Sequence, residues 1–129
     1  MSTIRNYILV DDDPFNNIIS TMEIEGALGE VNVTIFENPE EALTFIQEEY
    51  VKTLAPAILF LDINMPSLSG WQFLENYDTF SEEIKKELVI YILSSSIDPR
   101  DTEKAKANKY IMGYIPKPLE SNMICYIAG

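Results

Sequence analysis

One short apolar run constrains the fold of this chain more than any other feature. Residues 57–61 are apolar without interruption, and the run is followed at once by Asp62 and then by a loop that ends at Gly70. A continuous apolar run this short is typical of a strand that is covered on both faces, so residues 57–63 are predicted to form a strand of a parallel sheet. In such sheets the loops after the carboxyl ends of the strands carry the chemistry, which makes Asp62 a candidate functional carboxylate.

Along the rest of the chain, short apolar segments alternate with helix signals. The other predicted strands are residues 7–10, 31–36, 88–93 and 112–115. Helices are predicted to begin near Pro14, Pro39, Trp71, Pro99 and Leu119. Three of these starts place a capping residue directly before a proline. Five strands that alternate with five helices predict βαβ units, and therefore one α/β domain over residues 1–129 with a mostly parallel sheet and helices on both faces.

Three segments allow more specific predictions. Asp13 is predicted to cap the first helix rather than to bind a ligand, and apolar residues at helical spacing from Phe15 to Met22 follow it. The fourth helix, after Pro99, is weakly amphipathic and is expected to pack lightly. Residues 81–86 are polar and are predicted to be a connection or a short extra turn.

The charge of the chain restricts its partners. The formal net charge is -12 over 129 residues, which argues against direct binding of nucleic acid, because phosphate binding is driven largely by lysine and arginine. It also argues against an anionic membrane surface, and it suits a divalent cation or a basic partner. The charge is uneven: residues 1–50 contain eleven acids and one base, Arg5, whereas residues 100–109 carry four basic side chains.

Several classes of chemistry are excluded by residues that the sequence lacks. With no histidine, neither histidine acid–base catalysis nor histidine metal ligation is possible. Cys125 is the only cysteine, so the chain forms no internal disulfide, as expected in a reducing compartment. The polar segment before the first strand is too short for a signal peptide, and no apolar run approaches the ~20 residues that span a bilayer. These features predict a cytoplasmic protein without membrane insertion.

Polar and charged residues stand at the ends of four predicted strands. The first strand ends in Asp11 and Asp12, the third in Asp62, the fourth in Ser94 and the fifth in Lys117. Because the carboxyl ends of parallel strands lie along one edge of a sheet, these groups are expected to converge. Carboxylates that lie close together repel one another and favour Mg²⁺, which prefers oxygen ligands. A cation beside a hydroxyl and an ammonium is complementary to a phosphoryl group, and a carboxylate can accept that group covalently.

The same residues carry a resemblance to the receiver domains of two-component response regulators. Residues 8–14 resemble the opening acidic pair of that family, and residues 61–66 with Gly70 resemble its phosphoacceptor segment. Residues 93–94 resemble its hydroxyl position, where Ser94 replaces the commoner threonine, and residues 114–118 resemble its switch aromatic and lysine. The resemblance covers essentially the whole chain. It implies a flavodoxin-like, doubly wound (βα)5 fold with strand order 2-1-3-4-5.

The resemblance also implies a role for each site residue. Asp62 would be the phosphorylated residue. Asp12 would bind Mg²⁺ directly, Asp11 would bind it partly through water, and Asp62 and the main-chain carbonyl of Asn64 would complete the protein ligands.

The remaining site residues would sense and hold the phosphoryl group. Ser94 would contact it and shift toward it on activation, and Tyr114 would rotate between an outward and an inward position in step. Lys117 would pair with the phosphoryl group, and the bond from Lys117 to Pro118 would be cis, which a proline at the second position allows.

The function that follows is that of a stand-alone response regulator, a signalling phosphoacceptor rather than an enzyme acting on other substrates. A sensor histidine kinase or a histidine phosphotransfer protein would donate a phosphoryl group to Asp62 in a Mg²⁺-dependent reaction. Phosphorylation would then change a partner-binding surface formed by the fourth helix, the fifth strand and the fifth helix. The phosphorelay output would be a protein target, or the chain would act as a phosphate shuttle in a relay.

Three alternatives are weaker. A Mg²⁺-dependent phosphohydrolase would need a second acid two residues after its nucleophile, where this chain has Asn64. A flavodoxin would need a phosphate-binding loop after the first strand, where three acids would repel the FMN phosphate. A degenerate receiver, acting as a phosphorylation-independent binding module, is disfavoured because all five site residues are present, but it remains the main alternative.

Overall fold

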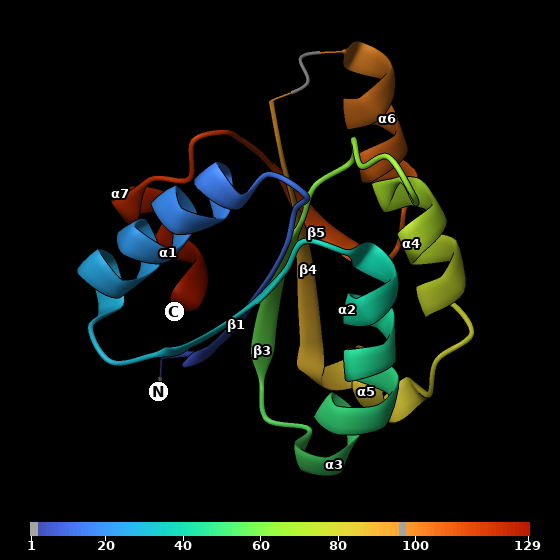
Figure 1. Ribbon diagram of the computed structural model, residues 1–129, viewed down its shortest axis with the longest axis horizontal. Coiled ribbons are helices and arrows are strands. Elements are labelled where there is room, and N and C mark those ends of the chain that lie inside the picture. The colour runs from blue at the N-terminus through green and yellow to red at the C-terminus, as the bar shows by residue number, and fades with distance from the viewer. Residues whose placement is uncertain (1–2, 96–97) are drawn as a thin grey trace.

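The computed structural model describes residues 3–95 and 98–129, so residues 1–2 and 96–97 of the predicted domain lie outside the description (Figure 1). Over the described residues, one sheet of five parallel strands has the predicted order β2-β1-β3-β4-β5. Its strands are β1 (Asn6–Val10), β2 (Asn32–Phe36), β3 (Ala57–Leu61), β4 (Leu88–Ser94) and β5 (Ile111–Pro116). The doubly wound α/β fold is therefore confirmed.

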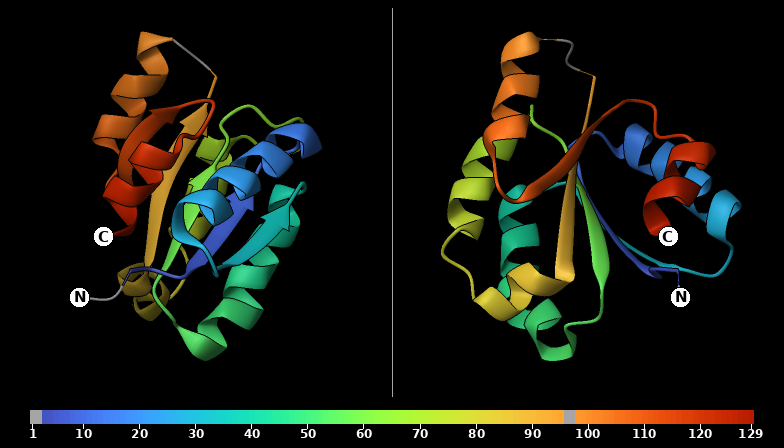
Figure 2. Two further views of the ribbon diagram at one scale, coloured as in Figure 1. Left: turned by 90° about the vertical axis from the view of Figure 1, so that its left-hand side faces the viewer. Right: turned by 180° about the vertical axis from the view of Figure 1, so that it is seen from behind.

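Helices cover both faces of this sheet, as Figure 2 shows. One face is covered by α1 (Pro14–Leu28) and α7 (Ser121–Ala128). The other is covered by α2 (Pro39–Phe45), the π-helical segment η1 (Ile46–Tyr50), α3 (Val51–Thr53), α4 (Gly70–Tyr77), α5 (Glu82–Glu87) and α6 (Pro99–Ala107). Across residues 3–95 and 98–129, no helix combines the length and the apolar character needed to cross a membrane.

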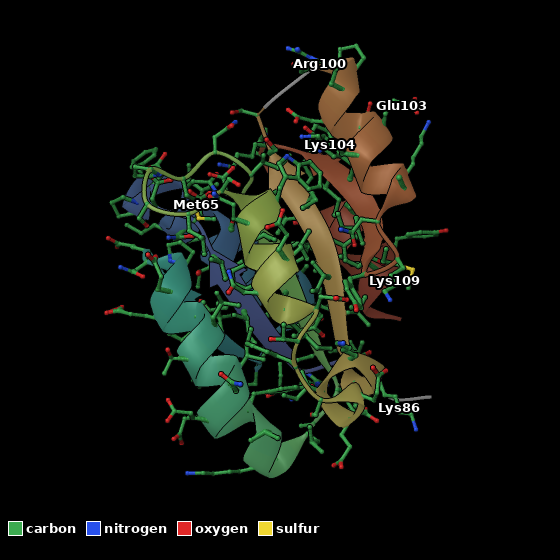
Figure 3. All side chains as sticks on the ribbon, turned by 90° about the vertical axis from the view of Figure 1, so that its right-hand side faces the viewer. Met65, Lys86, Arg100, Glu103, Lys104 and Lys109 are labelled. Atoms are coloured by element: carbon green, nitrogen blue, oxygen red, sulfur yellow. The ribbon has the colours of Figure 1, made fainter. Side chains whose placement is uncertain are left out.

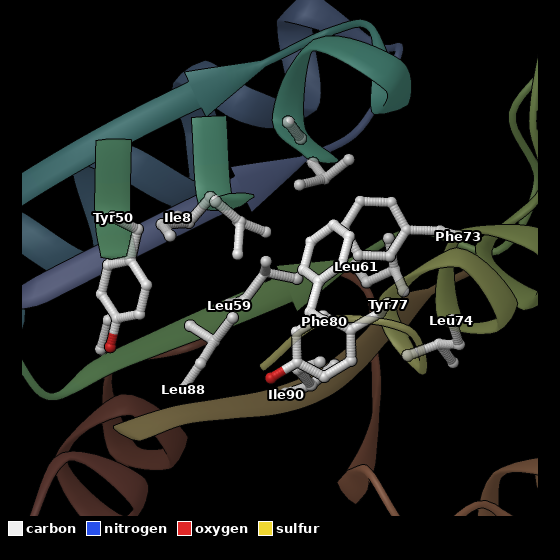
Figure 4. Close-up of a cluster of buried hydrophobic side chains, with 14 of the residues drawn as sticks. Ile8, Tyr50, Leu59, Leu61, Phe73, Leu74, Tyr77, Phe80, Leu88 and Ile90 are labelled. Atoms are coloured by element: carbon white, nitrogen blue, oxygen red, sulfur yellow. The ribbon is translucent and has the colours of Figure 1, made fainter. Parts of the chain in front are cut away.

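The central strand β3 explains why the sheet needs helices on both sides. All five of its residues are buried. Leu59 and Leu61 point into the core beneath α2 and α4 (Figure 4), whereas Ile58 and Phe60 point into the core beneath α1 and α7. Alternate side chains of a strand face opposite sides, so an uninterrupted apolar run fits only a strand with two covered faces.

One segment prediction differs from the structure. The strand predicted over residues 57–63 ends at Leu61, and the chain turns away after Asp62. Of the two alternatives predicted for the polar segment 81–86, a connection or a short extra turn, the structure has the second, the short helix α5. Its start is capped by Ser81, whose hydroxyl accepts a hydrogen bond from the Ile84 amide, and Ile84 is buried in the core, so one apolar residue anchors an otherwise polar helix.

Helix α1 turns its large apolar residues outward. The predicted cap is confirmed, because the Asp13 side chain accepts a hydrogen bond from the amide of the second helical residue. However, Phe15, Ile18 and Met22 are 69%, 56% and 66% exposed. The side of the helix that faces the protein instead carries the buried residues Asn17, Ser20 and Ile24.

Candidate functional site

Parallel pairing brings the strand ends together at one edge of the sheet. Val10 of β1 lies opposite Leu61 of β3, so the residues that follow them, Asp11 and Asp62, are neighbours. The Asp62 amide donates a hydrogen bond to the Val10 carbonyl at 3.0 Å, which fixes the backbone at the point where β3 ends. The sheet therefore aligns two carboxylates that are far apart in the sequence.

Three carboxylates form a cluster at this edge. Asp11, Asp12 and Asp62 each place one oxygen within 4.8 Å of the others. Asp11 and Asp62 are buried and Asp12 is exposed, so the cluster opens to solvent on one side.

Asp11 is held by donors from the start of α1. One carboxylate oxygen accepts from the Asp13 amide at 2.9 Å, and the other accepts from Asn16 Nδ2 at 2.8 Å. Asn17 Nδ2 donates to the Asp11 carbonyl at 2.8 Å. These contacts explain the two asparagines at the start of α1, and neither of them was predicted to belong to the site. Only their positions in the first turn after the acids could have pointed to them.

Lys117 brings a positive charge into the cluster. Its Nζ lies 2.7 Å from Asp11 Oδ2 and 3.6 Å from Asp62 Oδ1. Burial lowers the pKa of the Lys117 ammonium, but the hydrogen bond to Asp11 and the charges of Asp11 and Asp62 outweigh burial and raise it above its ordinary value. Lys117 is therefore protonated at neutral pH.

The carboxyl group of Asp62 is perturbed by its surroundings. Burial, followed by the charge of Asp11, raises the pKa of Asp62 to about 6, although Lys117 and a backbone hydrogen bond from Asn64 lower it. Burial is therefore the main cause of the shift, and of the charged neighbours Asp11 raises the pKa of Asp62 by more than Lys117 lowers it.

The donor set suits a small divalent cation. Three carboxylate oxygens converge, and hard cations such as Mg²⁺ prefer oxygen ligands. Asp11, Asp12 and Asp62 are the side chains that would hold such a cation. Its charge would favour the ionised form of Asp62 and neutralise negative oxygens brought to the site.

The other predicted residues lie along the same edge. Ser94 ends β4, is buried, and accepts a hydrogen bond at its carbonyl from the Lys117 amide at 3.0 Å. Tyr114 of β5 is half-buried and packs against the core beneath α2 and α4. Asn64 is exposed in the loop after Asp62. The peptide bond from Lys117 to Pro118 is cis, as predicted.

Comparison with known proteins bears directly on this arrangement. The sequence model of the response regulator receiver domain matches residues 7–128. The chain belongs to the response regulator receiver family. A search of curated proteins returned no match.

Solved structures of receivers are similar over nearly the whole chain. A two-component response regulator from Cytophaga hutchinsonii is 29% identical, with a TM-score of 0.89 over 98% of this chain and 95% of that one. A response regulator receiver protein from Dyadobacter fermentans is 25% identical, with a TM-score of 0.86 over 95% and 94%. The CheX-CheY-BeF3-Mg²⁺ complex from Borrelia burgdorferi contains a chain of the same fold, 23% identical, with a TM-score of 0.72 over 95% and 84%.

Replacing Asp62 of this receiver with asparagine is expected to stabilise it by about 1–2 kcal/mol at pH 7 without Mg²⁺. Because the pKa of Asp62 is raised to about 6, the folded protein binds that proton more tightly than the unfolded chain. Wild-type stability therefore falls as the pH rises from about 4 to about 6. The full shift corresponds to about 3 kcal/mol, and partial access of water to the cluster reduces it. Urea unfolding of both proteins measures the difference.

The pH and metal dependence of this difference provide the controls. The difference in the free energy of unfolding between Asp62→Asn and the wild type should be small at pH 4 and constant above about pH 7. Mg²⁺ at about ten times its Kd should stabilise the wild type by about 1.4 kcal/mol and narrow the gap. Glu25→Gln removes an exposed carboxylate from α1 and should show neither effect. A wild type more stable than Asp62→Asn at pH 7 without metal would contradict the prediction.

Proposed function

We propose that this receiver accepts a phosphoryl group on Asp62 from a phosphohistidine donor in a Mg²⁺-dependent reaction. The observation that carries the proposal is the placement of the buried Asp62 beside Asp11, Asp12 and the ammonium of Lys117. A single nucleophilic carboxylate is thus surrounded by groups that can bind a cation and pair with a phosphoryl oxygen.

The chemistry needs one bond to form and one to break. A carboxylate oxygen of Asp62 attacks the phosphorus, the bond from phosphorus to the donor nitrogen breaks, and the electron pair stays on the departing imidazole, which takes a proton from water. Lys117 would pair with an oxygen of the transferred group, and the Ser94 hydroxyl would donate a hydrogen bond to another. Mg²⁺ bound by the three aspartates and the Asn64 carbonyl would supply charge stabilisation. The CheX-CheY-BeF3-Mg²⁺ complex from Borrelia contains a chain of the same fold, which supports this proposal.

The consequence of phosphorylation would be a changed partner surface. Ser94 and Tyr114 would shift together, and the downstream protein would bind the face formed by α6, β5 and α7. The light packing of α6 supports a movable face, because Ala105 is the one buried residue among those described in this helix.

Intact mass measurement after incubation with acetyl phosphate and Mg²⁺ tests the proposal. We expect a gain of one phosphoryl group that hydroxylamine removes, and no gain in Asp62→Asn or in the presence of EDTA. Absence of the gain in the wild type would favour the degenerate receiver, a binding module that works without phosphorylation.

The outward face of α1 supports a protein as the donor. Phe15, Ile18 and Met22 form an exposed apolar strip on the helix that starts beside the acidic cluster. Apolar strips of this kind beside a reactive group are typical of protein interfaces. A donor that packed on the strip would bring its phosphohistidine to Asp62.

Replacing Ile18 with glutamate is therefore expected to slow phosphotransfer from a protein donor at least about tenfold, because it places a charge in the apolar contact. The rate with acetyl phosphate should stay unchanged. The measurement uses a phosphorylated histidine phosphotransfer protein that phosphorylates the wild type. Met112→Glu, at an exposed methionine of β5, is the matched control. Equal slowing with both donors would contradict a docking role for the strip.

A further inference from the structure

The side-chain amide of Asn16 contacts a carboxylate of the acidic cluster directly. Asn16 lies in the first turn of α1 and is half-buried. Its Nδ2 donates a hydrogen bond to Asp11 Oδ2 at 2.8 Å, and Asp11 is buried. The resemblance to receiver domains assigns no role to Asn16, so its role has to follow from this contact and from the groups around it.

Donors already occupy most of the acceptor positions of the Asp11 carboxylate. The Asp13 amide donates to Oδ1 at 2.9 Å, and Asn16 shares Oδ2 with Lys117, whose Nζ lies at 2.7 Å. A carboxylate has about four acceptor positions, so these three donors leave about one for a cation. Because the donors fix the orientation of the carboxylate, they also determine where the position left for a cation lies.

The two neighbouring asparagines hold different parts of Asp11. Asn17 Nδ2 donates to the main-chain carbonyl of Asp11 at 2.8 Å, which fixes the first turn of α1 against the end of β1. The Asp13 cap holds the same turn through the Phe15 amide. Asn16 instead donates to the carboxylate itself. Asn17 therefore positions the helix, and Asn16 orients the side chain of Asp11 from a helix that is already fixed.

Lys117 cannot orient Asp11 throughout the proposed reaction. Its Nζ lies 2.7 Å from Asp11 Oδ2 and 3.6 Å from Asp62 Oδ1. When Lys117 pairs with a phosphoryl group on Asp62, its contact with Asp11 weakens. Asn16 carries no charge, so it can remain on the Asp11 carboxylate without repelling a cation, as an ammonium does. Asn16 is thus the side-chain donor that suits Asp11 both before and after Lys117 changes its partner.

We propose that Asn16 is a positioning residue, which holds Asp11 in the orientation that binds Mg²⁺. The inference rests on the proposed function, because it gives Asn16 a part in the same metal-dependent transfer. Removing a hydrogen-bond partner that orients a metal-binding side chain typically weakens metal affinity or activity by about 10- to 100-fold. Loss of the Asn16 amide should therefore weaken Mg²⁺ binding by a factor in this range.

Titration with MgCl₂, followed by calorimetry, measures this effect without a phosphoryl donor. The pH is kept above the pKa of Asp62, so that this carboxyl is ionised. Asn16→Leu keeps the approximate shape of the side chain and removes the donor, and Asn16→Ala removes it in a smaller side chain. Both should raise the Kd for Mg²⁺ about 10- to 100-fold. Asn16→Gln retains an amide on a longer side chain and should recover part of the lost affinity.

The control variant makes the same substitution on the other side of the sheet. The Asn76 amide donates to the Gln72 carbonyl at 3.0 Å within α4, the helix on the face of the molecule that Figure 3 shows. Asn76→Leu therefore also removes an amide that bonds to a carbonyl, but away from α1. It should leave the Kd for Mg²⁺ unchanged. Circular dichroism checks the fold of each variant, and Asn16→Ala decides the outcome if Asn16→Leu does not fold.

The Mg²⁺ dependence of phosphorylation separates positioning from a structural role. In Asn16→Leu, the Mg²⁺ concentration that gives half the maximal rate with acetyl phosphate should rise by the same factor as the Kd. The rate at saturating Mg²⁺ should stay close to that of the wild type, because bound Mg²⁺ restores the orientation of Asp11. A site disrupted for structural reasons would lose rate at saturating Mg²⁺ as well.

Two results would overturn the inference. One is a folded Asn16→Leu or Asn16→Ala that binds Mg²⁺ as tightly as the wild type. The other is a loss of affinity in Asn76→Leu as large as that in Asn16→Leu. Failure of the proposed function would differ from both, because the wild type would then bind Mg²⁺ in a way that depends on Asn16 and yet gain no phosphoryl group.

Discussion

Replacing Lys117 with methionine is expected to slow phosphoryl incorporation from acetyl phosphate about 100- to 1,000-fold at pH 7, the usual cost of removing one stabilising donor from a site of this kind. The Lys117 ammonium lies 3.6 Å from Asp62 Oδ1, so it is close enough to face a group attached to this carboxylate. Methionine keeps the length and apolar stem of the side chain and removes its charge.

Two effects of removing Lys117 slow phosphorylation, and measuring the rate at two pH values separates them. Without Lys117, which lowers the pKa of Asp62, less of that carboxyl is ionised at pH 7. Raising the pH to about 8.5 should restore the part of the rate lost in this way. It should not restore the part lost because no ammonium faces the phosphoryl oxygens in the transition state. The measurement is the initial rate of phosphorylation by intact mass at both pH values.

Two controls test whether Lys117→Met is folded and whether the loss of any lysine slows the reaction. Asp11 loses its 2.7 Å partner in Lys117→Met, so circular dichroism in Mg²⁺ must show a wild-type spectrum. Lys86→Met removes an exposed lysine from α5 and should leave the rate unchanged. A rate within about threefold of the wild type would show that Lys117 pairs with Asp11 for structural reasons only.

The sequence was sufficient to predict the sheet and the edge on which the site lies. The uninterrupted apolar run of β3 requires two covered faces, and that requirement implies parallel strands whose ends align. Asp11 and Asp62 then become neighbours because their strands pair in register. Such predictions succeed because the alternation of side chains along a strand ties sequence position directly to side-chain direction.

The sequence could not predict which side of α1 faces the protein. Helical spacing from Phe15 to Met22 shows that these residues share one side, and an apolar side normally faces the core. Here the inner side carries Asn17, which donates to the Asp11 carbonyl, and Ser20, whose hydroxyl has no hydrogen-bond partner among the described residues. At Asn17 the demand of the site for a hydrogen-bond donor overrides the hydrophobic pattern, and this demand appears only after the helix has been placed against β1.

Which aspartate lies closer to Lys117 also depends on tertiary structure. Its convergence with the acids follows from the strand ends, but its closer approach to Asp11 than to Asp62 depends on side-chain positions that no spacing encodes. The close approach of Gly70 to Asp62 is a further feature of this kind, and it leads to the second large effect.

Adding one methyl group at two glycines is expected to change stability in opposite directions. A Cβ at Gly70 would lie 2.7 Å from the Asp62 carbonyl oxygen and 2.9 Å from Ile63 Cα. Both atoms belong to the backbone, so the clash can be relieved only by moving the segment that holds Asp62. Gly70→Ala should therefore lower the free energy of unfolding by about 1–3 kcal/mol, the usual cost of overpacking.

Gly26→Ala is the matched substitution in an open position. Gly26 lies within α1, and among the described residues nothing lies within 4 Å of the Cβ that alanine would add. Alanine also restricts the unfolded chain and favours the helix, so this change should raise the free energy of unfolding by about 0.5–1 kcal/mol. Urea unfolding of both variants measures the two changes.

Phosphorylation distinguishes a local effect at Asp62 from a general loss of stability. Because the Gly70 amide donates a hydrogen bond to the Ile63 carbonyl at 2.8 Å, α4 begins against the same backbone that carries the carboxylate. Gly70→Ala should displace Asp62 from Lys117 and slow phosphoryl incorporation even at temperatures where the variant is fully folded. Gly26→Ala should retain the wild-type rate. Two results would contradict this explanation: a change of stability in the same direction in both variants, or phosphorylation of folded Gly70→Ala at the wild-type rate. Either would show that the close approach of Gly70 to the backbone of Asp62 and Ile63 is not the reason for glycine at this position.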